Sequence, residues 1–228
     1  MIKKVAAIAG TGALMLSSAA FSASTVSFSD PAPDVGIGYE WTVAMLLNPT
    51  DTAVTAEFVR HVGAKSSYEP ANAAPEIGWQ HTSDWVALDL PQETLLTIEL
   101  NNQRGVQYTT VDAEGKVSQL TAGQGYFPGF AVYKGWDDTS TEIHSFNPLG
   151  NFWAAQLDWI TAAYDQVGQH GSEAKRSAKT RLILPAGHYS INIGSVSALY
   201  CTPEQPCYNG RHGYIAKLTA EPVPAGSQ

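Results

Sequence analysis

Basic residues are scarce in this chain of 228 residues, and their scarcity excludes one broad class of partner. Lys and Arg together number 13 against 21 Asp and Glu, which gives a formal net charge of −8. Nucleic-acid binding depends on clustered positive charge that neutralises phosphates. We therefore expect no nucleic-acid partner.

Long apolar runs are also rare, and the only notable one lies at the N-terminus. Lys3 and Lys4 precede a short apolar run over 5–16, and small residues follow over 17–24. This order is typical of a secretory signal peptide, whose apolar part is too short to span a membrane. The sequence predicts a signal peptide over 1–23 and an exported protein, at the cell surface or secreted, that is not transmembrane.

Cysteine is limited to two residues, Cys201 and Cys207. Two cysteines this close in an exported protein are expected to form a disulfide, because the compartment is oxidising. The loop that they close is short, so chain-entropy arithmetic predicts a contribution of about 2 kcal/mol. A cysteine-based metal pair is the alternative.

Three motifs of catalytic chemistry are absent. The sequence has no Gly-x-Ser-x-Gly nucleophile elbow, no His-Glu-x-x-His zinc motif and no Gly-rich phosphate loop after a strand. Neighbouring carboxylates such as Asp137 and Asp138 are typical of a solvated acidic loop. We therefore expect a binding protein and not an enzyme.

Short alternating segments are abundant, and turns rich in Gly and Pro separate them. This pattern predicts an all-β, antiparallel β-sandwich, jelly-roll-like, with long loops and at most one or two short helices. Only over 152–164 does the spacing of apolar residues favour a helix as an alternative to a strand. The polar stretch 166–180 is expected to be a loop. We expect one domain over 24–220 and a flexible tail over 221–228. Strands are expected over 26–28, 52–62, 85–90, 94–100, 107–111, 116–120, 130–133, 181–184, 188–194 and 214–218.

Two segments resemble the signature of secreted jelly-roll domains of the pre-peptidase C-terminal type. The first runs from Ser83 to Ile98 and contains Asp84-Trp85 followed by Leu90-Pro91; the second, over 184–194, matches the closing turn and strand. Both motifs are short, and they support the fold more than any function.

Trp79 and His81 stand two positions apart, just before the alternating run over 85–90. Two residues apart in an extended chain face the same side. An imidazole is a ready metal ligand at neutral pH, whereas an intact indole only donates a hydrogen bond. The pair is therefore either ordinary packing or a site at which the Trp has been altered. The remaining tryptophans are expected in the core or at an interface: Trp41, Trp85, Trp136, Trp153 and Trp159.

The triplet Trp79-Gln80-His81, in an exported acidic β protein, resembles the copper-repressible surface proteins of methanotrophic bacteria, the CorA/MopE group. In that group the Trp is oxidised to kynurenine, and its aryl amine binds one Cu(I) together with two histidines. The resemblance implies that Trp79 is the kynurenine precursor and His81 the first imidazole. It also implies one Cu(I) per chain, copper acquisition at the outer surface of the cell, and an outer-membrane or periplasmic uptake partner.

The resemblance places the second imidazole well downstream. His144 fits that separation best, while His170, in a polar stretch, and His188, in the closing turn and strand, stay open as alternatives. The six histidines are otherwise scattered, with no His-x-His pair. The acidic loop over 135–140 is a weaker site for Ca²⁺, because it lacks the EF-hand pattern.

Three other functions compete with copper binding. Jelly rolls often bind sugars through exposed aromatic rings, and this chain has 6 Trp and 10 Tyr, so a carbohydrate- or surface-adhesion module without metal is the first. A copper oxidase or oxygenase is the second, and a structural envelope protein is the third.

Overall fold

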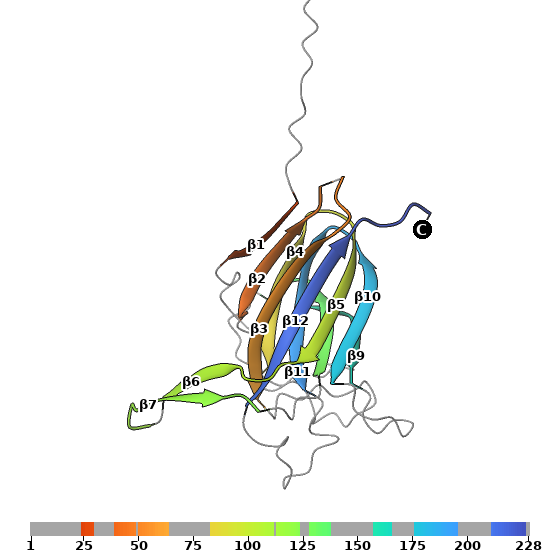
Figure 1. Ribbon diagram of the computed structural model, residues 1–228. Coiled ribbons are helices and arrows are strands. Elements are labelled where there is room, and N and C mark those ends of the chain that lie inside the picture. Colours follow the sequence, from red (N-terminus) through yellow and green to blue (C-terminus); the bar gives the residue numbers. More distant parts are fainter. Residues whose placement is uncertain are drawn as a thin grey trace, which may run out of the picture.

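A computed structural model describes residues 24–29, 39–48, 50–63, 83–111, 113–123, 128–137, 157–165, 176–195 and 211–226. Every regular element in these ranges is a strand, and the strands form two facing sheets and a projecting hairpin (Figure 1). The predicted all-β sandwich is therefore confirmed. No helix in the described ranges is long and apolar enough to cross a membrane.

The larger sheet has six strands in the order β1-β2-β4-β11-β8-β9. Its neighbours are antiparallel except for β2 and β4, which run parallel from the pair Trp41 and Val86 onward. Its strands are β1 (Thr25–Ser29), β2 (Trp41–Leu46), β4 (Asp84–Leu90), β11 (Gly187–Ser195), β8 (Pro128–Lys134) and β9 (Asp158–Tyr164).

The smaller sheet has four antiparallel strands in the order β10-β5-β12-β3. They are β10 (Ser177–Leu184), β5 (Thr94–Asn102), β12 (Arg211–Glu221) and β3 (Val54–Gly63). The hairpin of β6 (Gln107–Val111) and β7 (Val117–Thr121) projects from the end at which β5 stops (Figure 1). Gly115 supplies the positive φ that its turn requires, at 80°.

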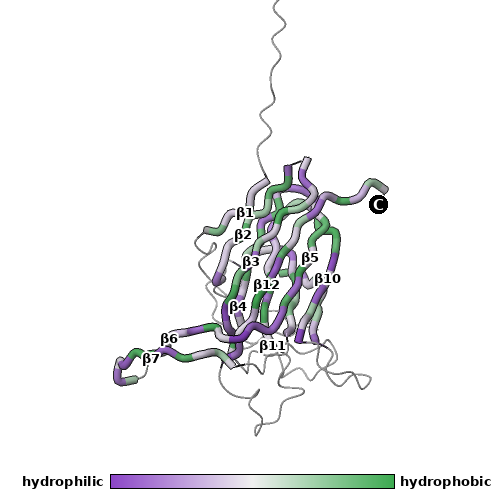
Figure 2. Tube along the Cα trace, in the orientation of Figure 1, coloured by the Kyte–Doolittle hydropathy of each residue, from purple (hydrophilic) through white to green (hydrophobic). Residues whose placement is uncertain are grey.

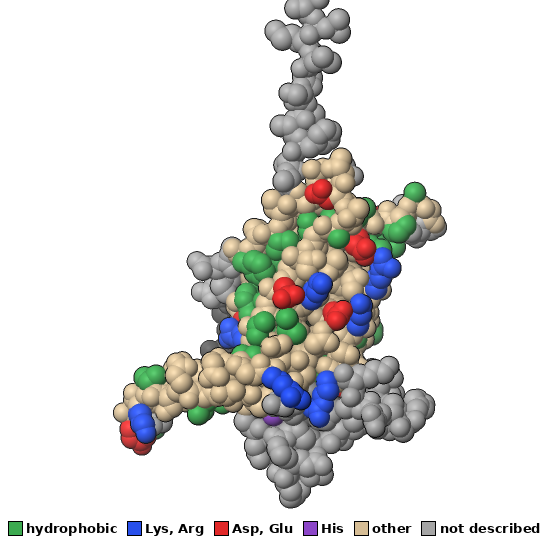
Figure 3. Space-filling view, in the orientation of Figure 1, with side chains coloured by type: hydrophobic (Ala, Val, Ile, Leu, Met, Phe, Trp, Pro, Cys, Tyr) green, Lys and Arg blue, Asp and Glu red, His purple; other side chains and the backbone are tan. Residues whose placement is uncertain are grey.

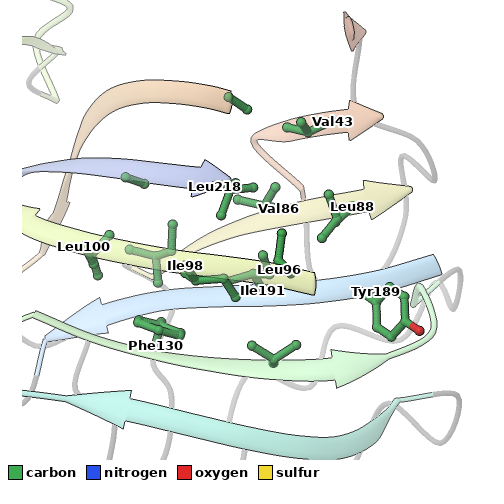
Figure 4. Packing of buried hydrophobic residues seen from close by; sticks show 14 of the residues in the cluster. Val43, Val86, Leu88, Leu96, Ile98, Leu100, Phe130, Tyr189, Ile191 and Leu218 are labelled. Atoms are coloured by element: carbon green, nitrogen blue, oxygen red, sulfur yellow. The ribbon is translucent and has the colours of Figure 1, made fainter. Parts of the chain in front are cut away.

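The core lies between the two sheets and follows from the alternation of side chains along each strand. Val86 and Leu88 point inward from β4, and Leu96, Ile98 and Leu100 point inward from β5 (Figure 4). Figure 2 shows the matching mixture of hydrophobic and hydrophilic positions along the strands of the four-stranded sheet. Its solvent side carries interspersed basic and acidic side chains (Figure 3).

The face of the six-stranded sheet turned away from the core, the outer face, is buried too. Strand β4 is consequently buried at nearly every position, and so is β8. Strands covered on both sides lose the clean alternation of apolar and polar residues. The buried outer-face side chains include Trp85, Ala87, Ala131, Tyr133, Ser190 and Asn192.

The expected strands are found, and two expectations need correction. The helical spacing over 152–164 does not produce a helix in its described part, because β9 pairs with β8 from Lys134↔Asp158 to Gly129↔Tyr164. Trp159 is 44% exposed there and is not a core residue. The expected loop over 166–180 is wrong at its end, because β10 begins at Ser177 and pairs with β5.

Candidate functional site

The residues that the sequence singles out for metal binding, Trp79, His81 and His144, lie outside the described residues, as do Cys201 and Cys207. Strand β4 begins at Asp84, three residues after His81. We call the end of the sandwich at which β4 begins the Asp84 end. The described residues at this end surround the point at which the chain continues from His81 into the sandwich.

Asp84 is a buried carboxylate at the open end of the core, in the same inward row as Val86 and Leu88. Across the sandwich, the hydroxyl of Tyr214 on β12 donates a hydrogen bond to its Oδ2 at 2.6 Å. Nε of Arg60 on β3 lies 3.5 Å from the same oxygen. Burial raises the pKa of Asp84 to about 6, although the Tyr214 hydrogen bond and the Arg60 charge oppose that rise.

Glu40 is the second carboxylate at this end. Its backbone N–H donates to the carbonyl of Trp85 at 2.9 Å, and its side chain accepts a hydrogen bond from the backbone N–H of Trp85. Burial and then the negative charge of Asp84 raise the pKa of Glu40 to about 8. The charge of Arg60 acts on both carboxyl groups and that of Arg211 also acts on Asp84, and protonation of Glu40 relieves the repulsion between the two carboxyl groups.

His61, on β3, is a neutral imidazole at this end. Nη1 of Arg211 lies 3.0 Å from Nδ1 of His61. A guanidinium only donates, so Nδ1 accepts and the ring proton sits on Nε2. Burial and then the charges of Arg211 and Arg60 lower the pKa of His61 to about 4. With Nδ1 occupied by Arg211 and Nε2 protonated, His61 is tied into a structural contact with β12.

His212 is a buried histidine whose position sequence reasoning missed. It is 2% exposed and continues the inward row of Tyr214 and Ala216 along β12. Gly123 lies against it so closely that a Cβ at Gly123 would stand 2.8 Å from its Nδ1. The sequence did contain a signal for this position: the residues at even-numbered positions after it are apolar. Because side chains two residues apart on a strand face the same side, that row indicates that the side chain at position 212 faces inward.

His188, one of the alternatives for the second imidazole, lies far from the Asp84 end. It pairs with Asp89 in the sheet, five residues along β4 from Asp84, which is a separation of about 17 Å. Its ring stacks on the indole of Trp136 with centroids 3.8 Å apart and planes at 7°. The indole N–H donates to the carbonyls of Leu88 and Tyr189, at 3.3 and 3.1 Å.

A chain of hydrogen bonds holds the segment before His144 on the outer face. The hydroxyl of Ser190 donates to the carbonyl of Gly135 at 2.7 Å, so the Tyr39 hydroxyl, 2.6 Å from Ser190 Oγ, donates to it. The backbone N–H of Asp137 donates to the Tyr39 hydroxyl at 2.8 Å. Asp137 is therefore fixed beside Ser190, the partner of Ala87 on β4.

The sequence separations set upper limits on how far His81 and His144 lie from described residues. Ala87 is three residues from Asp84, a distance of about 10 Å along the strand. His144 is seven residues beyond Asp137, which spans up to about 24 Å, and His81 lies within about 10 Å of Asp84. On β4 the odd-numbered side chains Trp85 and Ala87 belong to the outer face.

Asn192 is an orphaned polar group on the same face. It is fully buried, opposite Trp85 on β4 and Ala131 on β8. Within the described part of the chain, neither its Nδ2 nor its Oδ1 has a hydrogen-bond partner. Buried amides are normally paired, so Asn192 marks a place on the outer face where a polar group is needed.

The described residues hold no group of three or more His, Cys, Asp and Glu side chains placed to bind a metal. Of the two carboxylates in the loop over 135–140, the structure describes only Asp137, which is buried. The Ca²⁺ site expected from that loop stays a prediction, because its other carboxylate, that of Asp138, lies outside the described residues.

No protein-family model matches the sequence, and no curated protein matches it. Among solved structures, the chain is similar to CorA, a surface-associated copper-binding protein important in copper acquisition by Methylomicrobium album BG8. The TM-score is 0.45 and the identity 13%, over 77% of this chain and 96% of that chain.

A second similar structure is that of MopE, a secreted protein of Methylococcus capsulatus in which an oxidized tryptophan facilitates copper binding. The TM-score is 0.39 and the identity 12%, over 73% of this chain and 84% of that chain. A third is PliG of Aeromonas hydrophila, a periplasmic inhibitor of g-type lysozyme, with a TM-score of 0.29 and 9% identity, over 79% of this chain and 96% of that one.

Proposed function

We propose that this chain is an exported copper(I)-binding protein with one mononuclear site, and that it serves copper acquisition at the cell surface. The ligands are Trp79 in the form of kynurenine, His81 and His144. The observation that carries the proposal is the triplet Trp79-Gln80-His81, placed directly before strand β4. An outer-membrane or periplasmic partner receives or supplies the copper.

The donor set suits the metal. Oxidation of Trp79 opens the pyrrole ring and replaces a donor-only indole N–H with an aryl amine that has a lone pair. Two imidazoles and one amine form a nitrogen site of low coordination number, and imidazole nitrogen is a donor suited to copper. The bound ion supplies one-electron redox chemistry when loaded. The role assigned to the residues of this chain is to hold the ion without turnover.

The described structure supports this ligand set through the outer face. The hydrogen-bond chain of Asp137, Tyr39 and Ser190 anchors the segment leading to His144 on the face to which Trp85 and Ala87 of β4 belong. The amide of Asn192, which has no partner among the described residues, offers an acceptor for an imidazole N–H and a donor for a ketone oxygen. Hydrogen bonds from neighbouring polar groups orient metal ligands toward the metal.

His170 is the main competitor of His144 as second imidazole. His170 belongs to the segment 166–175, which has a described residue on each side. Before it, the N–H of Asp165 donates to the carbonyl of Pro128. After it, the carbonyl of Arg176 accepts from the N–H of Asn102. Both anchors lie at the same end of the sandwich as Asp84, the first residue of the strand that follows His81 in the sequence. Separate Ala variants of His144 and His170 therefore decide between them.

The test is peptide mass spectrometry of native protein across Trp79-Gln80-His81, with copper measured on the same sample. We expect a gain of about 4 Da on Trp79, from loss of one carbon and gain of one oxygen, and one copper per chain. His81→Ala is expected to lose the copper while His188→Ala keeps it, because His188 lies at the other end of β4. Unmodified Trp79 in native material without copper would overturn the proposal.

A further inference from the structure

We propose that a second site, a pocket beside the projecting hairpin, binds a small oxyanion that carries a carboxylate or phosphate group. Its lining residues are Asn102, Gln103, Arg104 and Arg176. None of these four residues is among the proposed copper ligands, and the proposal does not rest on copper binding.

The pocket has the size of a small-molecule site. Its volume is about 570 Å³, within the range that proteins use for ligands. Asn102 ends β5, and the next two residues begin the connection to the hairpin, while Arg176 directly precedes β10. Because β5 and β10 are hydrogen-bonded neighbours, two strands of the four-stranded sheet fix the two walls.

The backbone of Arg176 indicates that its side chain is required. Its φ is 59°, and it is the one described non-Gly residue with a positive value. Gly or Asn adopts this conformation readily, whereas a long side chain is strained in it. The conformation is enforced from both sides: the N–H of Arg176 donates to Oδ2 of Asp165 at 2.7 Å, and its carbonyl accepts from the N–H of Asn102 at 3.0 Å. Strain of this kind concentrates at functional sites.

The backbone at Arg104, which carries the second guanidinium, is held by Gln103. Nε2 of Gln103 donates to the carbonyl of Arg104 at 3.3 Å, and the N–H of Gln103 donates to Gly213 on β12 at 2.9 Å. No carboxylate among the described residues forms an ion pair with Arg104. On the same sheet, by contrast, Lys179 forms an ion pair with Glu99 and Arg181 forms one with Glu221.

The chemistry of the lining selects the ligand class. Guanidinium groups present planar forks of N–H donors that match carboxylate and phosphate oxygens. Two of them in one pocket are notable in a chain whose net charge is −8. Figure 3 shows basic side chains gathered at this end, over the lower ends of the four-stranded sheet. The side-chain amides of Asn102 and Gln103 add donors and acceptors for hydroxyl groups beside the anion.

Calorimetric titration of copper-free protein with inorganic phosphate and with citrate tests the site. We expect saturable binding that weakens as salt is raised, and a loss of affinity of about tenfold or more in Arg104→Gln. Arg176→Gly removes the guanidinium but suits the positive φ, so it should lose binding while its melting temperature is kept or raised. Arg181→Gln is the matched control, since it removes one cation from the same sheet outside the pocket.

A second arm distinguishes a free anion from a lipid headgroup. Phosphatidylcholine vesicles with and without phosphatidylglycerol are sedimented with the parent protein and with Arg176→Gly. If the parent protein binds the anionic vesicles and Arg176→Gly does not, the ligand is a lipid headgroup. If the protein binds phosphate or citrate but not the vesicles, the ligand is a soluble anion. Absence of both kinds of binding, or equal binding by the parent, Arg104→Gln and Arg176→Gly, would overturn the proposal.

Discussion

The hydroxyl of Tyr214 donates a 2.6 Å hydrogen bond to the carboxylate of Asp84, and this contact joins the two sheets at one end of the core. Asp84 begins the strand that follows the Trp79-Gln80-His81 triplet, while Tyr214 lies near the beginning of β12, an inner strand of the opposite sheet. The entry of the candidate ligand segment into the fold is therefore fixed by a buried polar contact.

Tyr214→Phe is expected to lower the free energy of unfolding by about 1–3 kcal/mol, because it leaves a buried carboxylate with one donor fewer. Chemical denaturation measures the change. Tyr189→Phe is the matched control: it removes a hydroxyl that donates to the neutral carbonyl of Pro185 at 2.7 Å. A cost for Tyr214→Phe no larger than that for Tyr189→Phe would contradict the importance of the charged acceptor.

Glu40 should make the protein less stable as pH rises. In the folded chain its carboxyl keeps a proton up to a pKa of about 8, whereas its ordinary value is 4.5. The folded state thus binds more protons in this window, and the free energy of unfolding falls as pH rises through it. Glu40→Gln is expected to flatten that fall in denaturation curves between about pH 5 and pH 8, with exposed Glu57→Gln as control. Parallel pH profiles for parent and Glu40→Gln would refute the assignment.

Two close-packed glycines should differ in their tolerance of a methyl group. At Gly213 an added Cβ would stand 2.4 Å from the backbone oxygen of Gln103, and at Gly123 it would stand 2.8 Å from the His212 ring. A backbone atom moves aside less readily than a side chain. Gly213→Ala should therefore lower the free energy of unfolding by more than Gly123→Ala does, and for Gly123→Ala we expect a loss of about 1–3 kcal/mol. Thermal melting of both variants checks the order, and the reverse order would show that His212 is held more rigidly than the loop at Gln103.

Two polar side chains on the outer face should respond in opposite directions to apolar replacement. Asn192 is fully buried and its amide has no hydrogen-bond partner among the described residues, so Asn192→Leu, at similar volume, should raise the stability of copper-free protein by about 1–3 kcal/mol. Ser190 links Tyr39 to Gly135, so Ser190→Ala should lower it. Urea denaturation measures both. A loss of stability in Asn192→Leu equal to that in Ser190→Ala would mean that the amide is satisfied in solution.

Alternation along the chain was sufficient to predict most strands, since local pattern and burial agree there. It did not reveal that the outer face is buried, because small residues such as Ala87 and Ala131 carry no periodic signal. The segment around Ile160 forms a strand despite its helical spacing, because it pairs with β8, a segment distant in the sequence.

The copper site at Trp79 and His81 stays a prediction from residue types and spacing, because both residues lie outside the described part of the chain. The partnership of Asp84 with Tyr214 and Arg60 depends on the packing of one sheet against the other. So does the inward position of His212. No local pattern contains that information.

The placement of the last two strands has a consequence for biosynthesis. Strand β11 lies between β4 and β8, and β12 lies between β5 and β3, so both sheets are completed from their C-terminal members. During N-to-C synthesis, β3 and β5 emerge long before β12 is available to pair with them. Closing such long-range pairings is slow. Neither sheet can therefore gain all its strands until the final quarter of the chain is made, and the inner edges of β4, β8, β5 and β3 stay without their final partners until then.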